Sequence, residues 1–454
     1  MNIVKEIFAE CRADHPAVIT PQEAISYGEL AARVEEHVPR LAAVSAPRIG
    51  LDCPDGITHI VLALAILKAG KCLVPLAQEL SLPERAAVVD QTHLGAILSG
   101  DGRISPAEQA QAPRFEEAAF DALNAAFIRF SSGTTGRSKG VVISHESLRD
   151  RVTAANRGLQ IGSADRVVWV LPMAHHFAVS IMLYLRQGAT TLLPESHMAK
   201  DLLSMARTHG ATVLYGAPFH HALLAAESSG DPWPTLRLAV STASALTEST
   251  AAAFQARYGV ALTQGLGIIE VGMSCLNLVA AREKPTAVGR PLPDFEIETR
   301  QGEIWIQGPG MLDAYLNPWR TRDDILTDGW FHSGDLGHYD EEGDLHLDGR
   351  SGSVINVAGM KCFPEEVEAV LREHPGVKGA RVLGRKHPRV GAIPVAEIIA
   401  VDPSKPPPIS ALVAHCRAAL SAYKIPMDFQ FVESISLTAS GKIRRGEEVE
   451  RKKN

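Results

Sequence analysis

The stretch FIRFSSGTTGRSKGVVISH, residues 127–145, is the most informative segment of the chain. Two apolar runs flank ten residues, 131–140, that contain three glycines, five hydroxyl residues, one arginine and one lysine. Apolar runs of this length predict buried strands, so the residues between them are expected to form a loop. Glycines let backbone N–H groups approach an anion closely, while hydroxyls and Lys139 add donors and charge. This composition predicts a phosphate-binding loop.

The loop differs from the GxxxxGK[ST] loop of P-loop NTPases. No lysine follows a glycine after the required gap, and a strand rather than a helix is expected next. A P-loop fold is therefore excluded, and the phosphate must be bound in another structural setting.

Outward from the loop, apolar runs alternate with helical patterns that end at glycines. This rhythm is typical of parallel sheets covered by helices. The strands are expected at 48–52, 72–76, 166–172, 211–216 and 236–241, and the helices at 58–69 and 199–209. After residue 285 the pattern changes to hairpins, which predict a smaller β-rich subdomain.

From residue 349 onward the chain predicts a separate α+β unit. Helices are expected at 364–374 and 409–420, with strands at 377–384 and 395–401. A length of 454 residues also favours more than one domain. The prediction is an α/β protein with a large N-terminal domain, 1–348, of stacked βαβ sheets and a β-rich subdomain, plus a small mobile C-terminal domain, 349–454.

Composition and charge restrict the classes of function. Hydrophobic residues make up 46% and charged residues 21% of the chain, as in globular enzymes. The net charge is −7, which does not favour nucleic-acid binding. Residues 1–349 contain 28 basic and 41 acidic residues, and residues 350–454 contain 17 and 11, so only the end of the chain is basic. That basic end either faces an anionic partner or is simply a solvated surface.

The cysteines and apolar runs predict a cytoplasmic protein. Six scattered cysteines form no CxxC pair, which disfavours a zinc site or redox dithiol and fits a reducing compartment. The first residues lack the long apolar run of a signal peptide. The most apolar stretch, 60–76, is interrupted by Lys68 and Lys71, so no membrane span is expected.

The segment FSSGTTGRSKGVVISH resembles the phosphate-binding signature of the adenylate-forming superfamily. That superfamily includes acyl-CoA synthetases, adenylation domains of non-ribosomal peptide synthetases and luciferase-type enzymes. The resemblance continues in order over essentially the whole chain. It implies ATP binding by Ser131, Ser132, Gly133, Thr134, Thr135, Gly136 and Lys139.

The segment LPMAHHFAVS, 171–180, is similar to the part of the superfamily that contributes the acid pocket. The resemblance assigns His175 a catalytic place near the carboxylate and makes His176 a pocket residue. No acidic residue occurs between Val167 and Pro194, so the ammonium group of an α-amino acid would lack a partner. An α-amino acid substrate is therefore disfavoured.

Two further segments resemble motifs that border the nucleotide and the acid. In STASAL, 241–246, Thr242 and Ala243 stand where many members have glycine. In TQGLGIIE, 263–270, the resemblance implies binding roles for Gly265 and Gly267 and a Mg²⁺ ligand at Glu270. The same segment departs from the pattern at Leu266, usually an aromatic residue that stacks on adenine, and at Ile269, often a threonine.

The last resemblances concern the end of the chain. Asp335, in FHSGDLGH, corresponds to the aspartate that holds the ribose hydroxyls, and Arg350 to a further ribose contact at the hinge. Gly352 replaces the usual hinge residue, and Gly359 corresponds to the thiol-transfer loop. Lys442, in LTASGKIRR, corresponds to the adenylation lysine.

Together these resemblances predict an acid–thiol ligase. The enzyme would activate a carboxylic acid as its acyl-adenylate with ATP and Mg²⁺, release pyrophosphate and transfer the acyl group to CoA or to an acyl or aryl carrier protein. An aromatic acid such as a hydroxybenzoate is favoured, with a medium-chain fatty acid as the alternative. Transfer to an amine, an adenylate-only enzyme and a non-catalytic nucleotide-binding regulator remain open.

Overall fold

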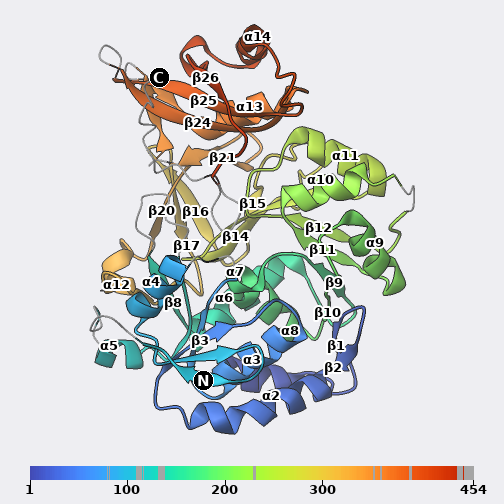
Figure 1. Cartoon of the computed structure of the whole chain (residues 1–454), viewed down its shortest axis with the longest axis vertical. Coiled ribbons are helices and arrows are strands. Elements are labelled where there is room, and N and C mark those ends of the chain that lie inside the picture. Colours follow the sequence, from blue (N-terminus) through green and yellow to red (C-terminus); the bar gives the residue numbers. More distant parts are fainter. Residues whose placement is uncertain are drawn as a thin grey trace. The chain divides into compact units, whose positions relative to one another are not determined.

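The computed structural model shows two compact units (Figure 1). It describes residues 1–78, 80, 82–108, 115, 117–130, 139–228, 232–350, 353–357, 360–387, 391–436 and 443. The first unit contains the described residues within 1–131, 138–297 and 306–331, and the second those within 298–305 and 332–454.

Two mixed sheets, each with a run of parallel strands at its centre, organise the first unit. One follows the order β15 (Arg290–Pro291), β14 (Gly272–Leu276), β13 (Leu262–Ile268), β12 (Leu238–Ser241), β11 (Val213–Gly216), β9 (Arg166–Trp169), β10 (Thr190–Leu192), β1 (Pro16–Ile19) and β2 (Ala24–Ser26). The other follows the order β19 (Arg320–Thr321), β18 (Ala314–Tyr315), β8 (Gly140–Ser144), β7 (Ala125–Phe130), β4 (Cys72–Pro75), β3 (Arg48–Asp52), β5 (Ala96–Ser99) and β6 (Ile104–Pro106). Antiparallel strands lie at the edges of both sheets.

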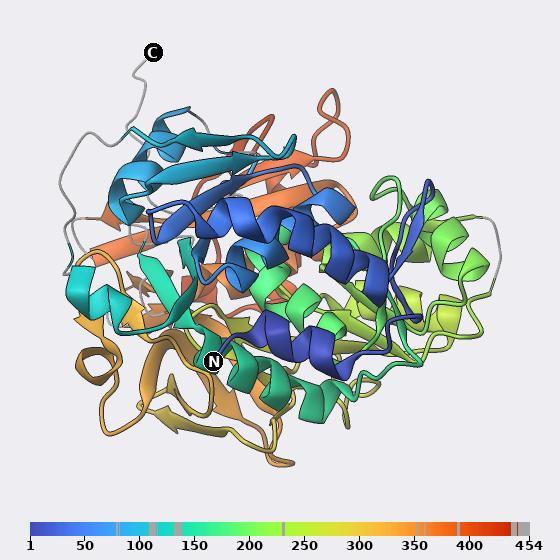
Figure 2. The same ribbon diagram turned by 90° about the horizontal axis from the view of Figure 1, so that it is seen from below.

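Helices pack against these sheets, several of them through an apolar face, as in α1 (Ile3–Glu10) and α9 (Ala199–Thr208). The other helices are α2 (Tyr27–Ala42), α3 (Ile57–Lys68), α4 (Leu82–Thr92), α5 (Glu117–Asp121), α6 (His145–Leu159), α7 (Met173–His176), the π-helix η1 (Phe177–Ile181), α8 (Met182–Arg186), α10 (Pro218–Ala226), α11 (Glu248–Tyr258) and α12 (Arg322–Ile325). Helix α3 is apolar on nearly all sides and packs beside α2, near the N-terminus of the chain (Figure 2). The first turn of α2 has a Ser26–Glu29 capping box.

The second unit has an α+β core of its own. A four-stranded sheet follows the order β16 (Glu296–Arg300), β17 (Glu303–Gln307), β20 (Phe331–Tyr339) and β21 (Leu345–Arg350). A second sheet follows the order β23 (Met360–Cys362), β22 (Ile355–Val357), β25 (Gly391–Ala400) and β24 (Val377–His387), with β26 (Phe429–Phe431) also paired to β25. Its apolar core includes Leu371 of α13 (Pro364–Glu373) and Leu412 of α14 (Ile409–Ala419); the short 3₁₀-helix η3 (Ala422–Lys424) follows.

These findings confirm the predicted α/β fold class, with a large and a small domain. The exact boundary at residues 348 and 349 stays a prediction. Within the described ranges, no helix has both the length and the apolar character needed to cross a membrane.

All six cysteines are free thiols. Cys53, Cys72, Cys275, Cys362 and Cys416 are buried, and Cys11 is partly buried. Burial raises the pKa of Cys53 and of Cys362 to about 11, with help from nearby carboxylates. These thiols therefore stay protonated near neutral pH.

Buried histidines make the first unit sensitive to acid. His221 in α10 is fully buried, and its Nε2 lies 3.1 Å from the carbonyl oxygen of Val240. Burial lowers the pKa of His221 to about 4, and the pKa values of His145 and His220 are also lowered to about 4. The unfolded chain, with an ordinary histidine pKa near 6.5, therefore binds more protons than the folded protein between about pH 4 and 6.5.

We expect acidification through this window to reduce the free energy of unfolding by about 1.4 kcal/mol per pH unit for each such histidine. His221→Gln should make the pH dependence shallower, as measured by denaturant unfolding at pH 7, 6 and 5. An unchanged slope in His221→Gln would contradict the assignment.

Candidate active site

The predicted phosphate loop joins two paired antiparallel strands. Strand β7 ends at Phe130 and β8 begins at Gly140, and these two residues are register partners. This confirms the strands expected on either side. The loop residues Ser131, Ser132, Gly133, Thr134, Thr135 and Gly136 lie outside the described residues.

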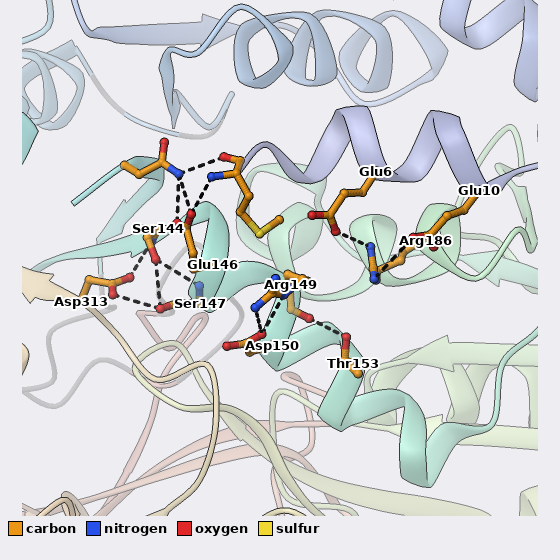
Figure 3. A network of polar contacts seen from close by, with 12 residues as sticks. Glu6, Glu10, Ser144, Glu146, Ser147, Arg149, Asp150, Thr153, Arg186 and Asp313 are labelled. Carbon is orange, nitrogen blue, oxygen red and sulfur yellow. Dashed lines mark hydrogen bonds and ion pairs between the residues drawn. The ribbon is translucent and has the colours of Figure 1, made fainter. Parts of the chain in front are cut away.

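A carboxylate fixes the chain where β8 passes into α6 (Figure 3). Asp313 accepts hydrogen bonds from the backbone N–H of Ser144 at 2.6 Å and from the hydroxyl of Ser147 at 3.0 Å. Arg322 forms an ion pair with the same carboxylate at 2.8 Å. Ser144 also caps α6 by accepting from the Ser147 N–H. The strand leaving the loop is thus held at its far end.

Lys139, Tyr315 and Glu270 form a connected array in the first unit. The Nζ of Lys139 lies 4.7 Å from the centre of the Tyr315 ring. The Tyr315 hydroxyl donates a hydrogen bond to Oε1 of Glu270 at 3.1 Å. Burial, together with Glu270, raises the pKa of Tyr315 well above its usual range, so the hydroxyl remains a donor. A cation, an aromatic ring and a carboxylate therefore meet beside the end of the predicted loop.

Tyr315 was not predicted from the sequence. It reaches the array because Tyr315 of β18 pairs with Val141 of β8, about 170 residues earlier in the chain. No local motif marks that pairing.

Glu270 fits the predicted role of a single magnesium ligand. Mg²⁺ is commonly held by one or two carboxylates plus phosphate oxygens and water. Among the described residues, no cluster of three or more metal-ligating side chains is present. A site of this kind would therefore depend on the phosphates of a bound nucleotide.

Arg151 supports the backbone next to Glu270. Its Nε and Nη2 donate to the carbonyl oxygen of Gly310 at 2.9 and 2.7 Å, and its Nη1 donates to that of Ile269 at 3.0 Å. Gly310 has φ +68°, and a Cβ added there would lie only 2.4 Å from the backbone nitrogen of Arg151. Only glycine fits this approach. Ile269 thus accepts a hydrogen bond from Arg151 through its backbone carbonyl, a role that does not depend on its side chain.

The predicted pocket residue His176 belongs to a cluster of rings centred on Trp169. Trp169, the last residue of β9, stacks on Tyr215 with ring centres 5.8 Å apart. Trp169 also forms edge-to-face contacts with His176 and Tyr184, whose ring centres lie 6.0 and 5.9 Å from its own. Trp169 and Tyr215 meet because they are register partners on neighbouring parallel strands. Since β9 and β11 both end here, the cluster lies at the carboxyl edge of the sheet, where α/β proteins bind ligands.

Hydroxyl groups lie among these rings. Burial raises the pKa of Tyr215 to about 12, against the opposing effect of the Ser180 and Thr242 hydroxyls beside it. The Ser180 hydroxyl lies within hydrogen-bonding reach of both Tyr184 and Tyr215, whereas Trp169 Nε1 is buried and has no hydrogen-bond partner in the described part of the chain. Buried polar groups are usually paired, so this cluster has capacity for a polar ligand.

Ala243 adopts a conformation that normally favours glycine. Its φ of +73° lies in the left-handed region, which side chains with a Cβ occupy at a cost. This explains why a glycine is the expected residue there. Gly265 and Gly267 lie on β13 near a register shift, and a Cβ on Gly265 would lie 2.9 Å from Leu276. Leu266 beside them is buried.

In the second unit, Asp335 lies on β20 opposite Arg350 of β21. Asp335 is 7% exposed, and its backbone N–H donates to the Ser333 hydroxyl at 3.1 Å. The Arg350 side chain is outside the described part. Gly352, Gly359 and Lys442 also fall outside it, so their predicted roles stay predictions.

Comparison with known families agrees with this geometry. The model named "AMP-binding enzyme" matches residues 6–316, and the model named "AMP-binding enzyme C-terminal domain" matches residues 366–442. The chain belongs to the AMP-binding enzyme family. The resemblance to the adenylate-forming superfamily is thereby confirmed.

Individual relatives of this AMP-binding enzyme are distant. It is 29% identical to a naringenin synthase of Pestalotiopsis fici over 95% of this chain, but spans only 18% of that protein. It is 26% identical to a feruloyl-CoA synthase of an Amycolatopsis species, with 93% of each covered. An amide bond synthetase from Marinactinospora thermotolerans has a TM-score of 0.83 at 25% identity, with 97% of each chain covered.

Proposed function

We propose that this AMP-binding enzyme activates a carboxylic acid with ATP and transfers the acyl group to a thiol. The acid's carboxylate displaces pyrophosphate from ATP to form an acyl-adenylate. The thiol sulfur then attacks the acyl carbon, AMP leaves, and the thiol proton is released. The array of Lys139, Tyr315 and Glu270 beside the predicted phosphate loop carries this proposal, because a cation and a carboxylate close together suit the binding of a metal–triphosphate.

Each group has a separate task in the proposed reaction. The loop residues and Lys139 screen the triphosphate, so that a negatively charged carboxylate can approach it. Magnesium held by Glu270 would neutralise phosphate charge. Asp335 accepts hydrogen bonds from the ribose hydroxyls. Lys442 donates both to the carboxylate of the acid and to the phosphate oxygens of ATP. A change of backbone conformation at residues 350–352 then exchanges Lys442 for the loop containing Gly359.

We propose an aromatic acid, such as a hydroxybenzoate, as the substrate. The rings of Trp169, Tyr215 and His176 offer flat contacts, and the buried indole N–H of Trp169, which has no partner among the described residues, suits a polar substituent. The name of the feruloyl-CoA synthase relative also favours an aryl acid. A medium-chain fatty acid is the second candidate; the buried Trp169 N–H, which has no partner among the described residues, counts against it.

The acceptor is proposed to be CoA or the phosphopantetheine of a carrier protein. The names of CoA-ligase relatives support a thiol. The name of the amide bond synthetase keeps an amine acceptor as a second candidate.

A pyrophosphate-release screen tests the proposal. Aryl, fatty and amino acids are assayed with CoA, with a holo carrier protein, with an amine, and without acceptor. We expect release with an aryl acid and product formation only with a thiol. Nucleotide binding without pyrophosphate exchange for any acid would instead identify a regulator, and product formation only with an amine would identify an amide-forming enzyme.

A further inference from the structure

An arginine occupies the apolar strand that leads into the phosphate loop. Arg129 is the second-last residue of β7, paired in register with Val141 of β8. Phe127 and Ile128 in the same strand are buried, whereas the Arg129 side chain is half-buried and only its Nε is known to be out of contact with solvent. A guanidinium group in this setting costs desolvation energy that an apolar side chain would avoid.

The Arg129 guanidinium connects two predicted parts of the site. Its Nη1 donates a hydrogen bond to the carbonyl oxygen of His175, the last residue but one of α7. It also lies close enough to Glu270 for the two charges to interact. One side chain therefore contacts the segment assigned to the acid and interacts electrostatically with the carboxylate assigned to the metal.

The group stays charged but is not fully paired. Burial lowers the pKa of Arg129 to about 10, against the opposing effect of Glu270, so the group is cationic at neutral pH. Its Nε is buried and has no hydrogen-bond partner within the described residues. Arg151 differs, since its guanidinium donates to two backbone carbonyls. A structural role accounts for Arg151, whereas Arg129 retains a buried charged donor.

We propose that Arg129 binds an oxyanion of the adenylation reaction while holding the His175 segment in place. The oxyanion is either the carboxylate of the acid or the α-phosphate of ATP, because both are acceptors for a guanidinium donor. This inference rests on the proposed function, and it adds a site residue that the phosphate loop and Lys442 do not supply.

Arg129→Lys, Arg129→Met and Arg129→Ala test the inference. Steady-state pyrophosphate release is measured at varied acid and varied ATP, with thermal unfolding as a check on folding. A charge-assisted hydrogen bond of about 1.5–3 kcal/mol corresponds to a loss of about 10- to 100-fold in kcat/KM for Arg129→Met. A rise in KM for the acid alone would identify the carboxylate, and a rise in KM for ATP alone would identify the α-phosphate. Arg129→Lys should keep more activity than Arg129→Met.

Chemical rescue separates a direct role from a structural one. Added guanidinium ion at millimolar concentration should restore part of the turnover of Arg129→Ala. Arg12→Met, which removes an exposed arginine paired with Asp14, is the control and should behave as wild type. Folded variants with both KM values and kcat within two-fold of wild type would overturn the inference, as would loss of activity that neither lysine nor guanidinium restores. Absence of wild-type turnover with every acid would instead count against the proposed function.

Discussion

Lys442→Ala is expected to abolish pyrophosphate release from acid plus ATP while sparing thiol transfer from a supplied acyl-adenylate. In the proposed reaction Lys442 supplies positive charge where the carboxylate and the α-phosphate meet, and that charge is needed only in the first half-reaction. Loss of one such electrostatic group typically lowers a rate by about 100- to 1,000-fold. Pyrophosphate release and thioester formation from synthetic acyl-adenylate are measured separately.

A second lysine provides the control for this prediction. Lys452→Ala removes a cation from the charged end of the chain, ten residues further on, and should leave both half-reactions unchanged. If Lys442→Ala slowed both half-reactions equally, the lysine would not be specific to adenylation and the assigned role would be wrong.

Glu270→Gln is expected to lower pyrophosphate release by about 100-fold. The amide keeps the size of the side chain and can still accept from Tyr315, but it lacks the charge that holds a metal–phosphate complex. The measurement is the rate as a function of Mg²⁺ concentration at fixed ATP. The midpoint should shift to higher Mg²⁺ in the variant.

Two companion variants locate the effect. Tyr315→Phe removes only the 3.1 Å hydrogen bond to Glu270 and should cost about 10-fold or less. Glu248→Gln changes an exposed carboxylate in the first turn of α11 and should have no effect. A Glu270→Gln enzyme with the wild-type magnesium midpoint would exclude Glu270 as the metal ligand.

Local patterns predicted the elements of the first unit well. Strand β3 occupies 48–52 as expected. Helix α3 occupies 57–68, one residue earlier at both ends than the predicted 58–69. Strand β9 is shorter than the predicted 166–172 and ends at Trp169. The apolar run continues beyond the strand to Pro172, the residue that precedes α7, so the apolar pattern overestimated the length of the strand.

Contacts between distant segments were not predictable in the same way. Tyr315 reaches Glu270 through the pairing of β18 with β8, and Trp169 reaches Tyr215 through the pairing of β9 with β11. Both depend on register, which a single sequence leaves open. Arg129 did leave a visible signal, a lone arginine within the apolar run FIRF, but its contact with His175 required the fold.

The buried thiols have a practical consequence for measuring the acceptor. Only thiolate reacts rapidly with chromogenic disulfide reagents. Cys11, the one cysteine that is not fully buried, has its pKa raised to about 11 by burial and by the nearby Glu10. The folded protein should therefore react little with such a reagent. The decrease in reagent colour during turnover would measure the consumption of the acceptor thiol directly. An increase in the reaction of the protein's own thiols in the same assay would indicate unfolding.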